Sequence, residues 1–149
     1  MTKGEKAKSL FLEGYNCAQA VFGAFCEDFG YDFETAMKLS SGFGGGMGRL
    51  REVCGAVSGM FMVFDIKHGY TDPKAKEEKI QLYKHIQTLA HEFEADNGSI
   101  ICRELLNLQE KSSVPIPEDR TENYYKKRPC AELVEFAADL VYSYMNKMA

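Results

Sequence analysis

The residues best suited to chemistry are the five cysteines, at positions 17, 26, 54, 102 and 130. Three of them lie at or near the expected start of a helix: Cys54, Cys102 and Cys130. The N-terminus of a helix presents unpaired N–H groups and partial positive charge, which favour a thiolate over a thiol. A thiolate binds metal ions, attacks disulfides and is readily oxidised. We therefore expect a functional thiol site.

A glycine-rich segment leads into Cys54. Seven of the 13 glycines fall between Gly42 and Gly59, although each glycine loses more backbone freedom on folding than any other residue. The segment does not complete a nucleotide-binding signature, because no Gly-Lys-Ser/Thr follows it and its GxGxxG match lacks a βαβ context. Gly55 and Gly59 are spaced to let another backbone approach closely. That neighbour is a second helix of the chain or a second subunit, so a homodimer is one of our expectations.

The spacing of the cysteines leaves the kind of site open. Gaps of 37, 48 and 28 positions separate Cys17, Cys54, Cys102 and Cys130, and the sequence contains no C-x-x-C pair. The close pairs of zinc ribbons, thioredoxin-like proteins and bacterial ferredoxins are therefore missing. Ligands contributed by separate helices can still meet in the core of a bundle. We interpret Cys26 instead as a buried core residue.

Hydrophobic periodicity predicts an all-α protein, one domain over residues 1–149 built as a bundle of five or six helices. An apolar stripe from Phe11 to Phe29 predicts one continuous helix that carries Cys17 and Cys26 on opposite faces. Further helices are expected over 33–40, 52–68, 71–97, after Ser99 and from Pro129. The helix over 52–68 is nearly all apolar, so we expect it at the centre, after a glycine-rich loop. Residues 109–129 hold three of the four prolines and are expected to form a surface loop.

Composition limits the partners. The chain has 18 basic and 22 acidic side chains, a net charge of -4 and no basic cluster, which argues against nucleic acid. The longest apolar run, residues 55–64, is about half as long as a membrane span. The first residues are charged and unlike a secretory leader. We therefore expect no membrane insertion and a cytoplasmic location, where cysteines stay reduced.

Several motifs together suggest a family. They are Asn-Cys-Ala-Gln-Ala-Val at 16–21, Gly-Phe-Gly-Gly-Gly-Met-Gly at 42–48 and Cys-Gly-Ala-Val-Ser-Gly at 54–59, followed by Cys102 and Cys130. In this combination the sequence resembles, nearly end to end, the family of redox-active proteins named for its cysteine pattern, C, CGAxxG, C and C. The resemblance implies a small helical protein, mostly cytoplasmic, whose redox role is inferred from its cysteines. It implies no particular substrate.

We interpret four cysteines as one site with catalytic and metal-ligating roles: Cys17, Cys54, Cys102 and Cys130. An iron–sulfur cluster that transfers electrons is the leading hypothesis, because four thiolates suit it and the family is redox-active. Two alternatives stay open. One is a metal-free thiol–disulfide oxidoreductase in which Cys54 attacks, and the other is a structural zinc site in a binding module.

Four further residues are expected to bind the cofactor: Gly44, Gly45, Gly46 and Arg49. Their N–H groups would donate hydrogen bonds to the sulfurs and so tune them. We expect the partner to be a redox protein or a small molecule, whose identity the sequence leaves open.

Overall fold

The computed structural model describes residues 1–108 and 114–148. Within these residues the chain forms helices and one isolated β-bridge, between Val53 and Ile101, and no strand longer than that. The all-α prediction is therefore confirmed for the described part of the chain. The helices are α1 (Lys3–Leu12), α2 (Cys17–Gly23), α3 (Phe33–Ser40), α4 (Gly44–Met47), α5 (Gly55–His68), α6 (Lys76–Asn97), α7 (Cys102–Leu105), α8 (Glu122–Lys127) and α9 (Cys130–Met148), with short 3₁₀ turns at Cys26–Phe29 and Ser41–Phe43.

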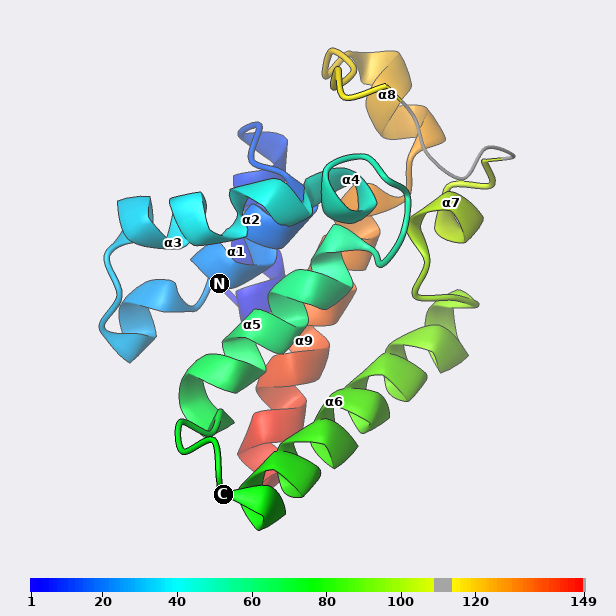
Figure 1. Ribbon diagram of the computed structural model, residues 1–149. Coiled ribbons are helices and arrows are strands. Elements are labelled where there is room, and N and C mark those ends of the chain that lie inside the picture. Colours follow the sequence, from blue (N-terminus) through cyan, green and yellow to red (C-terminus); the bar gives the residue numbers. More distant parts are fainter. Residues whose placement is uncertain (109–113, 149) are drawn as a thin grey trace.

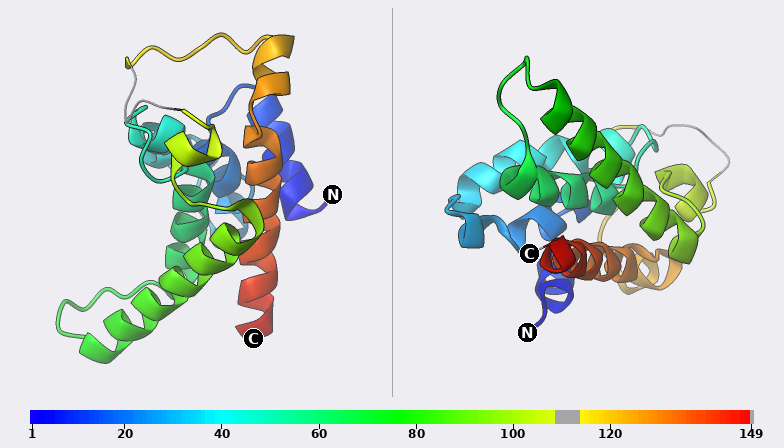
Figure 2. Two further views of the ribbon diagram at one scale, coloured as in Figure 1. Left: turned by 90° about the vertical axis from the view of Figure 1, so that its right-hand side faces the viewer. Right: turned by 90° about the horizontal axis from the view of Figure 1, so that it is seen from below.

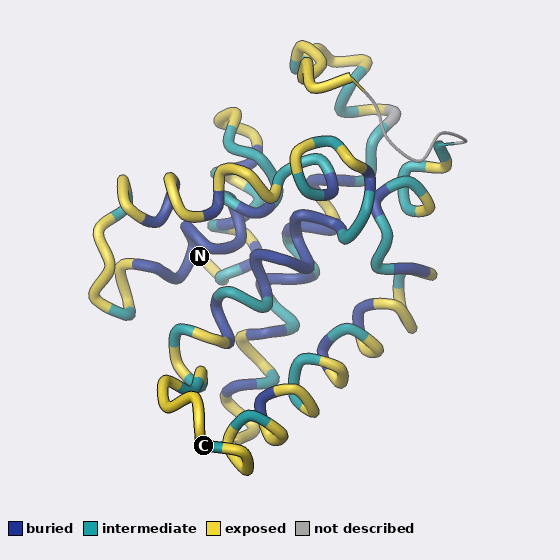
Figure 3. The backbone as a smooth tube through the Cα atoms, in the orientation of Figure 1, coloured by how far each residue is buried: buried dark blue, intermediate teal, exposed yellow. Residues whose placement is uncertain are grey.

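Helix α5 lies at the centre of the bundle. It packs against α2, α6 and α9, while α1 packs against α9 and α2 (Figures 1 and 2). Most of α5 is buried (Figure 3), as the apolar run predicts. The largest fully buried side chains are aromatic and come from four separate parts of the chain: Phe11, Phe25, Phe64 and Phe93. They form one continuous hydrophobic core beneath the end of the molecule where α4 and α7 lie.

The predicted helix from Phe11 to Phe29 is not continuous. Helix α1 ends at Leu12, and Gly14 follows with a φ of 116°, a left-handed conformation that glycine adopts without steric cost. Asn16 then starts α2 with a capping box, in which its side chain accepts from the Gln19 N–H and the Gln19 side chain accepts from the Asn16 N–H. These local signals outweigh the apolar period. Cys17 therefore occupies the start of a helix.

The glycines of α5 serve contacts inside the chain. A Cβ placed on Gly59 would lie 2.9 Å from the Ala18 carbonyl oxygen, and one on Gly55 would lie 3.0 Å from the Cys17 Cβ. Both residues therefore let α5 approach α2, which confirms the expected helix contact. Because they are buried in this way, they supply no argument for a subunit contact.

Two other boundaries differ from the sequence-based expectation. Helix α6 begins at Lys76 rather than near residue 71, because Asp72 accepts from the N–H groups of Lys74 and Ala75 in a turn. The expected loop over 109–129 contains α8, which Thr121 caps by accepting from the Tyr124 N–H. Residues 109–113 of that loop lie outside the described residues. Among the helices described, none is both long and apolar enough to cross a bilayer.

Candidate thiol redox site

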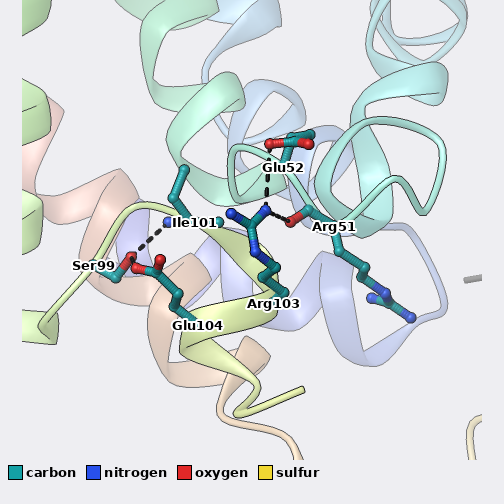
Figure 4. A network of polar contacts seen from close by, with 6 residues as sticks. All are labelled: Arg51, Glu52, Ser99, Ile101, Arg103 and Glu104. Atoms are coloured by element: carbon teal, nitrogen blue, oxygen red, sulfur yellow. Dashed lines mark hydrogen bonds and ion pairs between the residues drawn. The ribbon is translucent and has the colours of Figure 1, made fainter. Parts of the chain in front are cut away.

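Two segments that are far apart in sequence lie side by side and bring Cys54 next to Cys102. The Cys54 N–H donates to the Ile100 carbonyl at 2.8 Å, and the Cys102 N–H donates to the Glu52 carbonyl at 2.6 Å. Arg103 reinforces the pairing, because its Nη1 lies 3.4 Å from both the Arg51 carbonyl oxygen and Glu52 Oε2 (Figure 4). The backbone itself therefore brings these two cysteine positions together.

The other two cysteines begin α2 and α9, which pack against each other. Cys17 is also near the start of α5, since a Cβ placed on Gly55 would lie 3.0 Å from the Cys17 Cβ. The side chains of Cys17 and Cys130 lie close enough that each shifts the pKa of the other. Helix α4 packs against both α5 and α7.

A cavity of about 570 Å³ is lined by all four cysteines that the sequence analysis singled out, namely Cys17, Cys54, Cys102 and Cys130. The residues expected to bind a cofactor line it as well: Gly44, Gly45, Gly46 and Arg49. Cys26 lies elsewhere, fully buried in the core, with its Sγ 3.6 Å from the Gly23 carbonyl oxygen. The structure thus gathers the expected residues around one cavity and keeps Cys26 apart from them.

The glycine-rich segment is a tight turn rather than an extended loop. Gly45 and Gly46 have φ values of 68° and 72° inside α4. The N–H groups of Arg51 and Glu52 donate back to the carbonyls of these two glycines. A Cβ on Gly46 would lie 2.6 Å from the Cys102 Cβ, so this position has no room for a side chain. The glycines shape one wall of the cavity, and the expected donation of N–H groups to sulfur stays a prediction.

Arg51 is the most deeply buried cation at the cavity, with 3% of its surface exposed. Its Nη1 donates to Cys102 Sγ at 3.6 Å, and its guanidinium extends away from Arg103 (Figure 4). Burial raises the pKa of Cys102, and this hydrogen bond together with the positive charge of Arg51 works in the opposite direction.

Helix starts do not make all of these cysteines acidic, contrary to the expectation from sequence. Cys54 precedes the first turn of α5, yet burial raises the pKa of its thiol to about 12, despite opposing hydrogen bonds from the N–H groups of Ala56 and Val57. Desolvation of the charged form outweighs the helix dipole here. The expected preference for thiolate is therefore wrong at Cys54, and also at Cys102, whose pKa burial raises despite Arg51.

Cys130 behaves differently. Its pKa is lowered, first by the hydrogen bond from Cys17 and then by the positive charges of Arg128, Arg120 and Arg51, against the effect of burial. The pKa of Cys17 is raised well above its ordinary value, chiefly by the same interaction with Cys130. The two thiols therefore titrate as a coupled pair, with the pKa of Cys130 lowered and the pKa of Cys17 raised.

Three residues of the cavity wall were missed by the sequence analysis: Arg120, Tyr124 and Arg128. Arg120 donates to the carbonyls of Phe11 and Tyr15 at 2.8 and 2.9 Å, and its guanidinium lies 4.2 Å from the centre of the Phe11 ring. These contacts hold the segment before α9 against α1 and against the loop between α1 and α2. Arg128 stands only two positions before Cys130 in the sequence, whereas nothing in the sequence distinguished Arg120.

The four cysteines that line the cavity are also a set of donors that a metal could bind. Four thiols are suitable ligands for zinc or for an iron–sulfur cluster. Within residues 1–108 and 114–148, however, no group of three or more His, Cys, Asp or Glu side chains is arranged to hold a metal ion. In this arrangement the site fits a pair of interacting thiols better than a metal centre.

The fold and the cavity together define a small helical protein with a four-cysteine site. The family model described as "Putative redox-active protein (C_GCAxxG_C_C)" matches residues 15–144, and the chain therefore belongs to this family. No curated protein and no solved structure shows significant similarity to the chain.

Proposed function

We propose that the protein is a thiol–disulfide oxidoreductase, with Cys130 as the attacking thiolate and Cys17 as the resolving thiol. The observation that carries the proposal is that Cys17 and Cys130 line the same cavity, where their coupling lowers the pKa of Cys130 and raises that of Cys17. A nucleophilic thiolate beside a protonated second thiol is the arrangement that disulfide exchange requires. We assign the attack to Cys130 rather than Cys54, because the Cys54 thiol has a pKa of about 12.

The reaction proceeds in two exchanges. The Cys130 thiolate attacks one sulfur of a substrate disulfide, a mixed disulfide forms, and the first substrate thiolate leaves and takes up the proton of Cys17. The Cys17 thiolate then attacks Cys130 Sγ and displaces the second substrate thiolate, which is protonated by solvent. The substrate disulfide is thereby reduced to two thiols, and the protein dithiol is oxidised to a disulfide. A dithiol reductant returns the protein to its starting state by the reverse path, as in the reducing cytoplasm where we place it.

A second candidate is a four-cysteine metal or iron–sulfur site for electron transfer. The observation in its favour is that Cys17, Cys54, Cys102 and Cys130 line one cavity. Such a site would be held by these four sulfurs, with Gly44, Gly45, Gly46 and Arg49 in the surrounding wall. A cluster would supply one-electron chemistry, whereas zinc would supply stability without redox activity.

Mapping the disulfides of anaerobically purified protein separates the two candidates. After oxidation with a small disulfide, peptide mass spectrometry should find one Cys17–Cys130 bond in the wild type and in the Cys26→Ser control. Cys130→Ser should not form it, and should not consume the substrate disulfide. A bond between other cysteines, or no bond at all, would contradict the proposal. Iron and sulfide, or zinc, present in stoichiometric amounts before oxidation would favour the second candidate.

A further inference from the structure

Four arginines line the cavity at the cysteines: Arg49, Arg51, Arg120 and Arg128. Glu118 is the only acidic residue in the described lining, and it pairs with Arg128. The chain as a whole has more acidic than basic side chains. The excess of positive charge is therefore a local property of this wall, and an excess of fixed cations in a concave site attracts anions.

The arginines are close enough to repel one another. Burial lowers the pKa of Arg49, and the positive charges of Arg51 and Arg128 lower it further. In the described residues, the only hydrogen bond of the Arg49 side chain is from Nε to the Val114 carbonyl oxygen, at 2.8 Å. This bond holds the side chain in place while the rest of the guanidinium can bind another acceptor. An anion in the cavity would relieve the repulsion.

Part of the remaining wall is apolar. It includes Leu105, Leu106, Pro115, Pro117 and Leu133. A volume of about 570 Å³ is within the range of small-molecule sites. An inorganic ion would leave the apolar wall uncovered, whereas an organic molecule with carboxylates would contact both parts of it.

We infer that the cavity binds a small organic disulfide or thiol that carries carboxylate groups, with Arg49 and Arg128 as the residues that select the anion. The redox step of this inference rests on the proposed function, but the binding of the anion does not. The ligand would lie with its carboxylates at these arginines and its sulfur near Cys130, which follows Arg128 by two positions. Neutral molecules of the same shape would gain only the apolar contacts.

Binding is measured by calorimetry with thiodipropionate, a thioether dicarboxylate that cannot exchange disulfides, and with its neutral diamide. We expect the dicarboxylate to bind the wild type and the diamide to bind more weakly. Arg49→Gln and Arg128→Gln should each weaken the dicarboxylate by about threefold to tenfold, the effect of losing one partly screened ion pair. Lys79→Gln removes one positive charge far from the cavity, beside Tyr70, and is the matched control.

Equal binding of the dicarboxylate and the diamide, or wild-type affinity in both arginine variants, would overturn the inference. Two separate variants are used so that misfolding of one, detected by circular dichroism, does not prevent the test. Oxidation of the protein by dithiodipropionate, the corresponding disulfide, tests the proposed function on the same scaffold. If thiodipropionate binds as expected but its disulfide analogue does not produce the Cys17–Cys130 bond, the proposed function fails and the anion site stands.

Discussion

The buried thiol of Cys54 makes the stability of the protein depend on pH in the alkaline range. Its pKa is raised by burial from 9.0 to about 12, and only 5% of the residue is exposed. In the unfolded chain the thiol loses its proton above pH 9, while in the folded protein it keeps the proton until about pH 12. The unfolded state therefore binds fewer protons in this window, and the free energy of unfolding falls as the pH rises.

The size of this effect follows from the two pKa values. Each pH unit between them costs at most about 1.4 kcal/mol, so the difference between 9.0 and about 12 corresponds to about 4 kcal/mol in total. A domain of this size has a free energy of unfolding of about 5–15 kcal/mol. The contribution of one thiol is therefore large enough to measure. It is fully present below pH 9 and is lost as the pH approaches 12.

Urea denaturation followed by circular dichroism, in the presence of a reductant, measures the effect at several pH values from 7.5 to 11. Because lysines and tyrosines also titrate there, the relevant quantity is the difference between the wild type and Cys54→Ser. We expect the wild type to lose stability more steeply above pH 9 than this variant. Parallel curves for the two proteins between pH 9 and 11 would refute the reasoning.

Cys130→Ser provides a control of opposite sign. The pKa of Cys130 is lowered in the folded protein, so its contribution to stability is present above the unfolded pKa and is lost as the pH falls. Relative to Cys130→Ser, the wild type should therefore gain stability as the pH rises from neutral toward 9. The same series of measurements contains both comparisons.

Three further predictions concern the geometry of the site. Cys17→Ala should slow the alkylation of Cys130 by neutral iodoacetamide at pH 7 about threefold to tenfold, because the Cys130 thiolate loses its donor, while the higher nucleophilicity of the remaining thiolate offsets part of the loss. Cys17→Ser keeps a donor and should slow the alkylation less. An unchanged rate in Cys17→Ala would exclude the assigned interaction of Cys17 with Cys130. Gly46→Ala should lower the free energy of unfolding by about 2 kcal/mol more than Gly98→Ala, since both glycines have positive φ but only Gly46 lacks space for a Cβ. Equal losses of unfolding free energy for the two variants in urea denaturation would contradict this prediction. Arg120→Gln should lower the free energy of unfolding by about 1.5–3 kcal/mol and expose residues 114–128 to limited proteolysis, because the carbonyls of Phe11 and Tyr15 lose a charged donor. An unchanged cleavage pattern would argue against the role of Arg120 as an anchor.

The sequence was sufficient for much of the fold. A nearly unbroken apolar run predicts that α5 is buried, and the start of α9 after Pro129 follows from a local signal. The same kind of local signal, Gly14 followed by a capping Asn16, interrupts the helix that apolar periodicity predicts. The apolar stripe and the capping residues can both be read from the sequence. Which of them determines the backbone between Phe11 and Phe29 is visible only in the folded structure, where α1 and α2 pack as separate helices.

The sequence also identified the residues around the cavity, through the cysteines, the glycine run and their resemblance to a family. It did not determine how these residues interact. The pairing of Cys54 with Ile100, the anchoring of Arg120 on α1 and the interaction of Cys17 with Cys130 all join segments that are far apart in the chain. Proton affinity depends on desolvation and on charges from such distant segments, and neither can be read from the residues next to a cysteine. For this reason a helix start alone predicts acidic thiols at Cys54, Cys102 and Cys130, whereas in the tertiary structure the pKa is lowered only at Cys130.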